Sequence, residues 1–537
     1  MIKLNLVQFS PVIGDLKGNL ARIKEFIISS RGELIIFPEL SLTGYMICDL
    51  AMRPAFIKDA ADAFSDLLEF SKNINAGIII GTIELLPNGS LTNACYLIER
   101  GEILSRNYKN QLPNYEIFDE KRIFTTFNHK EVVNFRNIRF GILICEDLWF
   151  KDDAVFLKAQ GAEVLICVNA SPFSKGKYKQ RQKIAQARFD ETNLPIIYVN
   201  NIGGQDSVVF DGGSFIYNNG ITLQLPFFEE VNYLCSLNDK PHIIEEPDEI
   251  AHIYNAAMLA LRDYTRNNNF SKIIIGLSGG IDSCITAVIA ADAIGPENVW
   301  CVMLPYIFTS PQTLSDATDF AKNLKVKYDV IPIQEGIDGI TRSLAPLIDF
   351  SEIDVTFENL QSRTRAIMLM ALSNKYGHLL VTTGNKSEMA VGYATLYGDM
   401  CGGYNPIKDI YKTEVYAIAK FRNHQKPKGA LGVDGVVISN DIIHKPPSAE
   451  LRPDQKDSDS LPDYEILDAI LYQLIEENKS IAEISNNGFD QKIVEKINRL
   501  LYLAEYKRMQ APIGAKISSK SFGLDRRYPI TNKWIYK

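Results

Sequence analysis

The sequence lacks several features that mark particular classes of protein. None of its stretches approaches the roughly 18 consecutive apolar residues of a membrane-spanning helix, so we expect no membrane partner. Its eight cysteines include no Cys-x-x-Cys pair, which argues against a zinc ribbon or a disulfide framework and favours a reducing, cytoplasmic location. Positive charge is not in excess, because 57 Lys and Arg residues face 65 Asp and Glu residues and the net charge is −8. DNA and RNA are therefore not expected as partners.

Signs of a targeting segment or of a disordered chain are also absent. The first nine residues have neither a long apolar core nor a small-residue cleavage site, and we expect them to form a strand. The chain contains no internal repeat or low-complexity tract. Hydrophobic residues make up 46% and charged residues 23% of its 537 residues, as is typical of a globular protein. This length predicts two large domains or about three or four smaller ones.

The first part of the chain alternates short apolar runs with amphipathic segments, which predicts an α/β domain over residues 1–240. Buried strands are predicted at 34–37, 77–81, 138–144, 164–168 and 196–199. Helices are predicted at 64–72 and 179–192. A polar stretch with two prolines follows, and we expect it to form a linker at 241–249.

A second α/β pattern begins after this linker and predicts another domain over residues 250–537. Apolar residues recur at helical spacing from Ile250 to Leu261, and strands are predicted at 272–277, 299–304 and 379–382. Segment 425–462 differs in composition, because it is polar and contains five prolines. This composition predicts a long flexible loop, and such loops often serve as lids or binding loops.

Three reactive side chains of the first domain lie near predicted strands. Glu39 ends the run 35–39, Cys145 follows the run 138–144, and Lys109 lies between them in the sequence. A thiol is a good nucleophile only as the thiolate, so it needs a cation and a proton acceptor beside it. Lys109 can supply the cation and Glu39 the acceptor.

Each of these residues alone has an ordinary structural explanation, since a buried cysteine usually packs as a small apolar residue. The combined pattern is more specific. Phe-Pro-Glu39, then Lys109-x-x-Leu-Pro-x-Tyr-x-x-Phe-Asp-Glu, then Cys145-Glu-Asp-x-Trp, in this order, resembles the nitrilase superfamily, and most closely its glutaminase branch. The resemblance implies an αββα sandwich. It also implies that Glu39 is the general base, Lys109 the cationic residue and Cys145 the nucleophile.

The same resemblance implies a glutamine site formed by Tyr115, Ser171 and Lys177. Taken alone, Ser171 is equally well explained as a turn residue and Lys177 as a solvated surface lysine. Glu116 and Glu120 follow Lys109 closely, and one of them is a candidate to assist proton transfer. The sequence does not choose between these two glutamates.

A glycine-rich loop follows the predicted strand 272–277 and reads Ser278-Gly-Gly-Ile-Asp-Ser283. Its glycines let the backbone approach a ligand, and the N–H groups at the start of the next helix favour an anion. The phosphate-binding motif Gly-x-x-x-x-Gly-Lys-Ser/Thr occurs nowhere in the chain. The Ser-Gly-Gly-x-Asp-Ser loop instead resembles the PP-loop of enzymes that cleave ATP between the α and β phosphates. The loop alone leaves the acceptor of the reaction open.

Further motifs narrow the reaction. Segments 358–365, 382–388, 392–399, 408–413, 505–508 and 520–529 resemble the synthetase domain of the glutamine-dependent NAD⁺ synthetase family. The resemblance covers residues 250–537 and implies a Rossmann-like parallel sheet carrying a PP-loop ATP pyrophosphatase site. It also implies that Asn359, Glu388 and Lys507 bind deamido-NAD⁺ and that Asp282 and Glu388 bind Mg²⁺. The ATP-binding residues that it implies are Gly276, Leu277, Ser278, Gly279, Gly280, Ile281, Asp282, Ser283, Thr383, Lys412 and Ser448.

The implied reaction is the last step of NAD⁺ biosynthesis. Glutamine is hydrolysed to glutamate and ammonia, ATP adenylates deamido-NAD⁺ with release of pyrophosphate, and ammonia displaces AMP to give NAD⁺. The resemblance also implies a homo-oligomer that pairs through the synthetase domains. Two alternatives stay open: an ammonia-only synthetase whose first domain is a non-catalytic module, and a PP-loop amidotransferase that acts on another acceptor.

Overall fold

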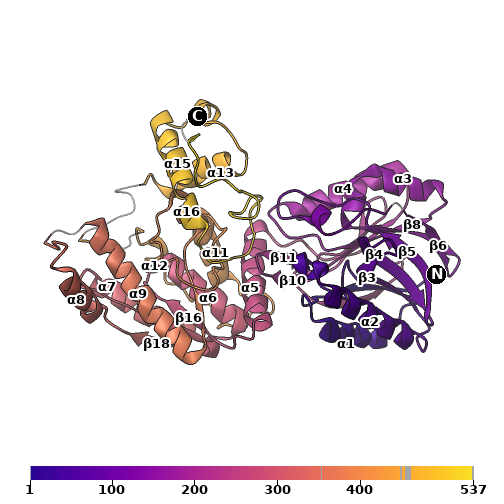
Figure 1. Cartoon of the computed structure of the whole chain (residues 1–537), viewed down its shortest axis with the longest axis horizontal. Helices are drawn as coiled ribbons and strands as arrows, with labels where there is room; N and C mark the ends of the chain where they lie inside the picture. Colours follow the sequence, from indigo (N-terminus) through magenta and orange to yellow (C-terminus); the bar gives the residue numbers. More distant parts are fainter. Residues whose placement is uncertain (1, 128, 352–353, 448–449, 454–460, 535–537) are drawn as a thin grey trace. The chain divides into compact units, whose positions relative to one another are not determined.

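The computed structural model describes residues 2–127, 129–351, 354–447, 450–453 and 461–534. Its contacts divide the chain into two compact units, Met1–Pro247 and Asp248–Lys537 (Figure 1). Within the described residues, no helix combines the length and the apolarity that crossing a membrane requires.

Two mixed sheets form the first unit, together with a two-stranded ribbon. The six-stranded sheet has the order β14-β1-β2-β3-β4-β5, and the seven-stranded sheet has the order β15-β13-β12-β9-β8-β7-β6. The six strands are β1 (Leu4–Gln8), β2 (Leu34–Ile36), β3 (Gly77–Leu85), β4 (Leu91–Glu99), β5 (Glu102–Tyr108) and β14 (Val231–Cys235). The seven are β6 (Val132–Phe135), β7 (Ile138–Ile144), β8 (Val164–Asn169), β9 (Ile196–Asn200), β12 (Phe215–Tyr217), β13 (Ile221–Gln224) and β15 (His242–Ile243). The ribbon pairs β10 (Ile202–Gln205) with β11 (Val208–Asp211).

The two sheets pack face to face because alternate side chains of each strand enter a shared core. On β7, Ile142 and Ile144 join a cluster that also contains Leu6 and Ile79 of the other sheet. Leu143, between them in the sequence, points to the opposite face and packs in a separate cluster that includes Leu157 of a covering helix. This alternation explains why the strands appear in the sequence as continuous apolar runs: both faces are buried.

Helices cover the outer faces of both sheets (Figure 1). The six-stranded sheet carries α1 (Leu16–Ser29) and α2 (Pro54–Ser71), and the seven-stranded sheet carries α3 (Lys151–Ala159) and α4 (Lys177–Thr192). The layer order is therefore α-β-β-α, as predicted. Helix α2 begins ten residues before the predicted start at 64, because Pro54 at its first turn fixes a helical φ and needs no donor there.

The second unit is built on a parallel four-stranded sheet of order β18-β17-β16-β19, which confirms the predicted Rossmann-like arrangement. Its strands are β16 (Ile273–Gly276), β17 (Val299–Met303), β18 (Lys327–Val330) and β19 (Leu379–Val381). The helices of its first part are α5 (Glu249–Asn267), α6 (Ile281–Ile294), α7 (Pro311–Leu324), α8 (Gln334–Leu344), α9 (Val355–Tyr376) and α10 (Lys386–Val391). Those of its last part are α11 (Lys412–His424), α12 (Asn440–His444), α13 (Tyr464–Ile475), α14 (Ile481–Asn486), α15 (Gln491–Leu503) and α16 (Glu505–Arg508).

A second core of this unit is formed where α10 packs against α13 and α15, and α14 packs against the same two helices. The segment 425–462, predicted to be a flexible loop, contains the short helix α12 with buried Ile442 and Ile443. Ser448, a predicted ATP contact in the same segment, lies outside the described residues.

Candidate active sites in the two units

The first candidate site begins at the end of β7, where Cys145 opens the 3₁₀ turn Cys145–Trp149. Cys145 has a φ of +47°, a left-handed conformation that few non-glycine residues adopt. The sharp turn takes the thiol out of the strand direction, yet it remains buried. Burial and the charge of Glu39 raise the pKa of this thiol well above its usual value, although Lys109 opposes the shift. The resting group is therefore a thiol, and it needs a base to accept its proton.

Lys109 brings two carboxylates together beside this cysteine. Its Nζ lies 2.7 Å from Glu39 Oε1 and 2.7 Å from Glu120 Oε1. Burial opposes the charge of Lys109, but Glu120 and Glu39 raise its pKa well above the usual value. Glu39 follows β2, Lys109 follows β5, and Cys145 follows β7, so the ends of three strands from two sheets meet at one point.

Glu120 rather than Glu116 makes the direct contact with Lys109. The Glu120 carboxylate also accepts a hydrogen bond of 2.7 Å from the hydroxyl of Tyr45. Burial raises the pKa of Glu120 to about 7, against the effect of Lys109. Glu116 is exposed, with a positive φ of 52°.

Two residues that the sequence did not indicate hold the Glu39 carboxylate. The side chain of Asn93, on β4, donates to Oε1 at 2.7 Å, and the backbone N–H of Ala170 donates to Oε2 at 2.8 Å. The Asn93 carbonyl also accepts from the Lys109 backbone N–H at 2.9 Å. Neither residue lies next to Glu39 in the sequence: the pairing of β4 with β5 places Asn93, and the packing of the two sheets places Ala170.

The predicted glutamine contacts lie against residues close to Cys145. The Tyr115 hydroxyl donates to Glu146 Oε1 at 2.9 Å, and Glu146 directly follows the cysteine. Burial raises the pKa of Glu146. Lys177 Nζ lies 4.2 Å from the ring centre of Trp149, at the end of the same turn, and burial lowers its pKa. Glu146 was not predicted as a site residue, and its position directly after Cys145 is the only sequence feature that indicates it.

Ser171 follows β8, one residue after the amide that binds Glu39. Its Oγ accepts a hydrogen bond of 3.0 Å from Arg181 Nε. Arg181 is buried and paired with Asp211 at 2.8 Å. Ser171 is thus held by a buried ion pair at the same edge of the sheet as the catalytic candidates.

The second candidate site lies in the other unit, where the glycine-rich loop joins β16 to α6. Gly279 has a φ of +79°, and a Cβ there would lie 3.0 Å from the Thr313 carbonyl oxygen, so the position requires glycine. The hydroxyls of Ser278 and Ser283 lie 3.0 Å apart. No side chain caps the N-terminus of α6, which leaves its first N–H groups directed at the loop.

Asp282, on the first turn of α6, meets Lys412 and Glu388 in front of this loop. Lys412 Nζ forms an ion pair with Asp282 and lies 3.3 Å from Glu388 Oε1. Burial opposes the charge of Lys412, but Asp282 and Glu388 raise its pKa. Asn385 fixes the other oxygen of Asp282 with a hydrogen bond of 2.9 Å.

The two carboxylates fit a magnesium site that is completed by phosphates. The side chains of Asp282 and Glu388 are 17% and 18% exposed, whereas that of Lys412 is 2% exposed. Mg²⁺ usually takes one or two protein carboxylates and fills its other positions with water and substrate phosphates. Across the described part of the chain, no group of three or more His, Cys, Asp or Glu side chains could hold a metal ion alone.

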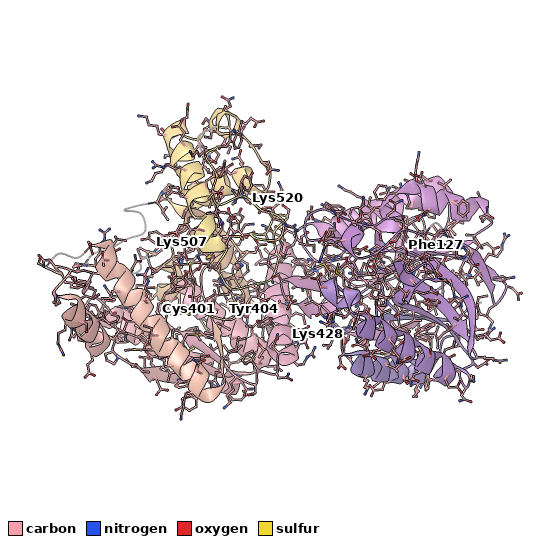
Figure 2. The ribbon with its side chains drawn as sticks, viewed as in Figure 1. Phe127, Cys401, Tyr404, Lys428, Lys507 and Lys520 are labelled. Carbon is pink, nitrogen blue, oxygen red and sulfur yellow. The ribbon has the colours of Figure 1, made fainter. Side chains whose placement is uncertain are left out.

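Two of the three predicted dinucleotide contacts, Asn359 and Lys507, bind one turn, whereas the Glu388 side chain lies at Lys412. Asn359 Oδ1 accepts from the Thr395 hydroxyl at 2.9 Å. Lys507, which Figure 2 labels, donates to the carbonyls of Gly392 and Ala394 at 2.8 and 2.7 Å. Burial lowers the pKa of Lys507. Thr383 follows β19, the strand next to β16, and therefore lies at the same edge of the sheet as the glycine-rich loop.

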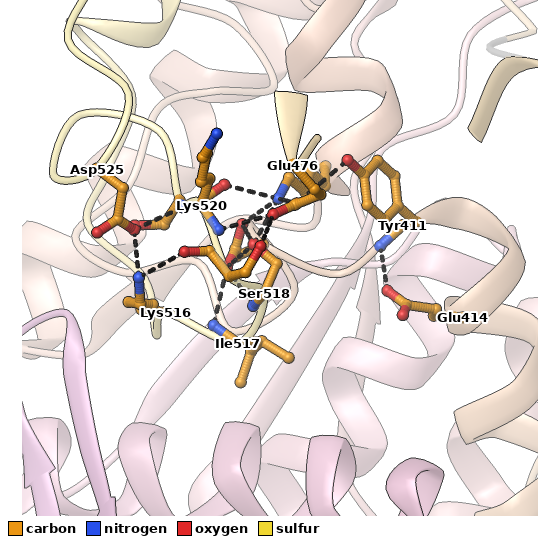
Figure 3. Close-up of polar contacts among 12 residues, drawn as sticks. Tyr411, Glu414, Glu476, Lys516, Ile517, Ser518, Lys520 and Asp525 are labelled. Atoms are coloured by element: carbon orange, nitrogen blue, oxygen red, sulfur yellow. Dashed lines mark hydrogen bonds and ion pairs between the residues drawn. The ribbon is translucent and has the colours of Figure 1, made fainter. Parts of the chain in front are cut away.

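A buried network that the sequence did not predict holds α10, and Figure 3 labels Glu476, Ser518 and Lys520 of this network. Lys386, at the start of α10, lies 2.9 Å from Asp409 and 2.6 Å from Glu476, and donates to the Lys520 carbonyl at 2.9 Å. The Asp409 carboxylate accepts from the backbone N–H of Ser518 at 2.8 Å. These contacts fix α10, which carries Glu388, to a segment more than a hundred residues later in the chain.

The two units therefore define a two-site enzyme, a carbon–nitrogen hydrolase joined to an ATP-using synthetase. Residues 3–232 match the carbon-nitrogen hydrolase family model, and residues 253–511 match the NAD synthase model. The glutamine-dependent NAD(+) synthetase of Rhodobacter capsulatus is 42% identical to this chain, over 99% of the chain and 98% of that protein. That of Acinetobacter baylyi is also 42% identical, over the same shares. The chain belongs to the family of glutamine-dependent NAD⁺ synthetases.

A solved structure of a member of this family is similar to the chain over its whole length. Glutamine-dependent NAD+ synthetase from Acinetobacter baumannii, solved in complex with ADP, has a TM-score of 0.79 and 38% identity, covering 100% of this chain and 99% of that one. Members of the family are ligases that use ATP and form a C–N bond with glutamine-derived ammonia. The family, fold class and main function predicted from the sequence are confirmed.

Proposed function

We propose that this chain hydrolyses glutamine at Cys145 and uses the ammonia to convert deamido-NAD⁺ into NAD⁺, with ATP cleaved to AMP and pyrophosphate. The observation that carries the proposal is the sealed cluster of Lys109 between Glu39 and Glu120, beside Cys145, in a chain that also has a PP-loop. This cluster supports a working glutaminase over a non-catalytic first module. We divide the two activities between residues 1–240 and 250–537, joined by a linker at 241–249.

In the first half-reaction, Glu39 takes the proton of the Cys145 thiol as the sulfur attacks the amide carbon of glutamine. Lys109 stabilises the negative oxygen of the tetrahedral intermediate. The C–N bond then breaks, Glu39 returns the proton to the leaving nitrogen, and ammonia departs from the thioester. A water molecule that gives a proton to Glu39 attacks the thioester, the C–S bond breaks to release glutamate, and Glu39 returns the proton to the sulfur of Cys145. Glu120, rather than Glu116, assists by holding the charge and position of Lys109.

Glutamine recognition follows from the charges beside the cysteine. The Lys177 ammonium is suited to the α-carboxylate of glutamine, and the Glu146 carboxylate to its α-ammonium group. Tyr115 orients Glu146 through its hydroxyl. Ser171, held by Arg181, offers a further polar contact.

In the second half-reaction, residues 276–283 hold the phosphates of ATP with backbone N–H groups and the hydroxyls of Ser278 and Ser283. The carboxylate of deamido-NAD⁺ attacks the α-phosphorus, pyrophosphate leaves, and ammonia then displaces AMP from the adenylate. Thr383 and Lys412 contact ATP, as does Ser448 from the segment 425–462. Asn359, Glu388 and Lys507 form the deamido-NAD⁺ site together with the turn 392–395.

Asp282 and Glu388 would hold Mg²⁺, since both expose carboxylate oxygens near the loop. The ion would neutralise negative charge on the phosphates. Lys412 compensates the same two carboxylates and keeps them at one point.

Pairing of two synthetase domains is proposed from the surface of α9. The side chains of Val355, Ile367 and Tyr376 on this helix are 66%, 64% and 56% exposed. Exposed apolar side chains of this kind can be covered by a second copy of the chain. We expect light scattering to give a dimer or a larger oligomer, and Ile367→Asp to weaken it. A wild-type monomer at micromolar concentration would contradict the pairing.

The assignment of glutamine hydrolysis to the first unit and of NAD⁺ synthesis to the second is tested with two variants and two nitrogen sources. Cys145→Ala is expected to abolish NAD⁺ formation from glutamine and to leave formation from ammonium salts intact. Asp282→Ala is expected to remove synthesis from either source while glutamate release continues. Products are followed as glutamate, AMP, pyrophosphate and NAD⁺. Release of ADP and phosphate, or indifference to deamido-NAD⁺, would overturn the proposal.

A further inference from the structure

Asp147 lies two residues after Cys145 and has no part in the reaction as proposed above. It is completely buried and forms an ion pair with Lys130, which is also buried. We propose that this ion pair is a positioning device that sets Lys109 against Cys145. The inference rests on the proposed roles of those two residues.

One oxygen of Asp147 holds the chain immediately after Lys109. Its Oδ1 accepts hydrogen bonds from the backbone N–H groups of Asn110 at 2.9 Å and Gln111 at 2.8 Å. Hydrogen bonds to a charged acceptor are about twice as strong as neutral ones. The two peptides that follow Lys109 therefore cannot shift without breaking two charge-assisted bonds.

Lys130 holds the chain immediately before Lys109. Its Nζ donates to the carbonyl oxygen of Tyr108 at 3.0 Å and also contacts Asp147 Oδ2. Lys109 is thus flanked by peptide groups that are bound to the two members of one ion pair. The position of its ammonium group does not depend on the end of β5 alone.

The same ion pair also holds the chain before the nucleophile. Asp147 Oδ2 accepts from the backbone N–H of Ile144 at 3.1 Å, and Ile144 is the last residue of β7. The next residue, Cys145, adopts its left-handed conformation at this point. A conformation of this kind persists only where neighbouring contacts determine it. Asp147 supplies one such contact and connects it directly to the peptides around Lys109.

The net charge of the pair is zero, which suits a positioning role. An unpaired carboxylate at the position of Asp147 would act on the thiol in the same direction as Glu39. Lys130 compensates that charge, so Lys109 is the cation that acts on Cys145. The Asp147–Lys130 pair therefore fixes geometry without competing for the charge of the reacting groups.

The test is Asp147→Asn, which keeps the shape of the side chain and removes its charge. A misplacement of about 1 Å can cost about 100-fold in rate. We expect kcat for glutamine hydrolysis to fall about 100-fold, KM for glutamine to change less than about threefold, and synthesis from ammonium salts to be unchanged. Alkylation of Cys145 by iodoacetamide, followed on its own peptide by mass spectrometry, should move to higher pH, because Lys109 no longer opposes the raised pKa of the thiol.

Asp153→Asn is the matched control. Asp153 lies 4.0 Å from Lys130 Nζ and accepts from the Asn110 side chain, not from its backbone. We expect it to change kcat less than about threefold, with the alkylation profile of the wild type. If Asp147→Asn does not fold, the test uses Lys130→Gln instead. Asp147 keeps its backbone donors in this variant, and we again expect a loss of kcat without a change in KM.

The inference would be overturned if Asp147→Asn kept the wild-type kcat or changed KM alone. It would also be overturned if synthesis from ammonium salts fell as much as glutamine hydrolysis. A wild-type enzyme with no glutaminase activity would instead overturn the proposed function, so the two failures are distinguishable.

Discussion

Lys109 in the hydrolase unit and Lys412 in the synthetase unit share one arrangement, an ammonium group between two carboxylates. They differ in access to solvent. Around Lys109 the side chains of Glu39 and Glu120 are 0% and 5% exposed, whereas Asp282 and Glu388 around Lys412 are 17% and 18% exposed. The Lys109 cluster is closed to bulk solvent, so its charges act on the molecules that enter the site. The open cluster can bind further charged groups, as a phosphate-bound cation requires.

A third lysine with the same arrangement has no reactive neighbour. Lys386 lies between Asp409 and Glu476, and all three side chains are almost fully buried. Burial opposes its charge, but Asp409 and Glu476 raise its pKa. The three sites together indicate that a lysine between carboxylates does not define a function. What lies beside the cluster, and how much of it solvent can reach, decides its use.

Removing the ammonium groups of the two proposed active sites should have the largest effect and should distinguish the activities of the two units. Lys109→Met is expected to lower glutamine hydrolysis by about 10²- to 10⁴-fold and to leave ammonia-driven synthesis unchanged. Lys412→Met is expected to lower synthesis from both nitrogen sources by a similar factor while glutamate release persists. Lys121→Met, at an exposed position close to Glu120, is the control. A loss of ammonia-driven synthesis in Lys109→Met would mean that the two clusters are not independent.

The third lysine should affect stability. Lys386→Met leaves two buried carboxylates without their cation, and breaking a buried ion pair in this way costs about 3–5 kcal/mol. We expect the free energy of unfolding, measured with urea, to fall by about this amount. Lys58→Met removes an exposed, solvent-screened ion pair with Asp62 and should leave the free energy of unfolding almost unchanged. Equal losses of unfolding free energy in the two variants would show that the Lys386 network does not stabilise the fold.

The partly exposed carboxylates around Lys412 should affect the Mg²⁺ requirement of synthesis. Glu388→Gln is expected to raise the Mg²⁺ concentration needed for half-maximal synthesis by about 10- to 100-fold, since it removes one ligand charge. Glu465→Gln, at an exposed position on α13, should leave the requirement unchanged. An unaltered Mg²⁺ titration in Glu388→Gln would remove this residue from the metal site.

The smallest expected effect is a change in the pH dependence of glutamine hydrolysis. Burial raises the pKa of Glu120 to about 7, so the group is mostly protonated at pH 6 and mostly ionised at pH 8. If the ionised form holds Lys109, glutamate release should rise about tenfold over this interval. Glu120→Gln should flatten this rise, and Glu116→Gln should preserve it. The same slope in both variants would assign the titration to another group.

The family resemblance in the sequence was sufficient for the layer order, and the apolar runs placed Glu39 and Cys145 at the ends of strands. Continuous apolar runs identify strands that are buried on both faces, and the ends of such strands meet where sheets pack. It could not choose between Glu116 and Glu120, because both follow Lys109 at short spacing and only the fold buries one of them. Asn93 and the ion pair of Asp147 with Lys130 were missed because their roles depend on strand pairing and on turns far apart in the sequence.

The contacts of Lys386 bear on the order in which the chain becomes active during synthesis. Its partners include Glu476 and the carbonyl of Lys520, so α10 cannot complete them until almost the entire polypeptide has left the ribosome. The hydrolase unit, complete at residue 247, can fold earlier, as N-terminal domains generally do. A nascent chain or a carboxyl-terminal truncation would therefore release ammonia before it could consume any.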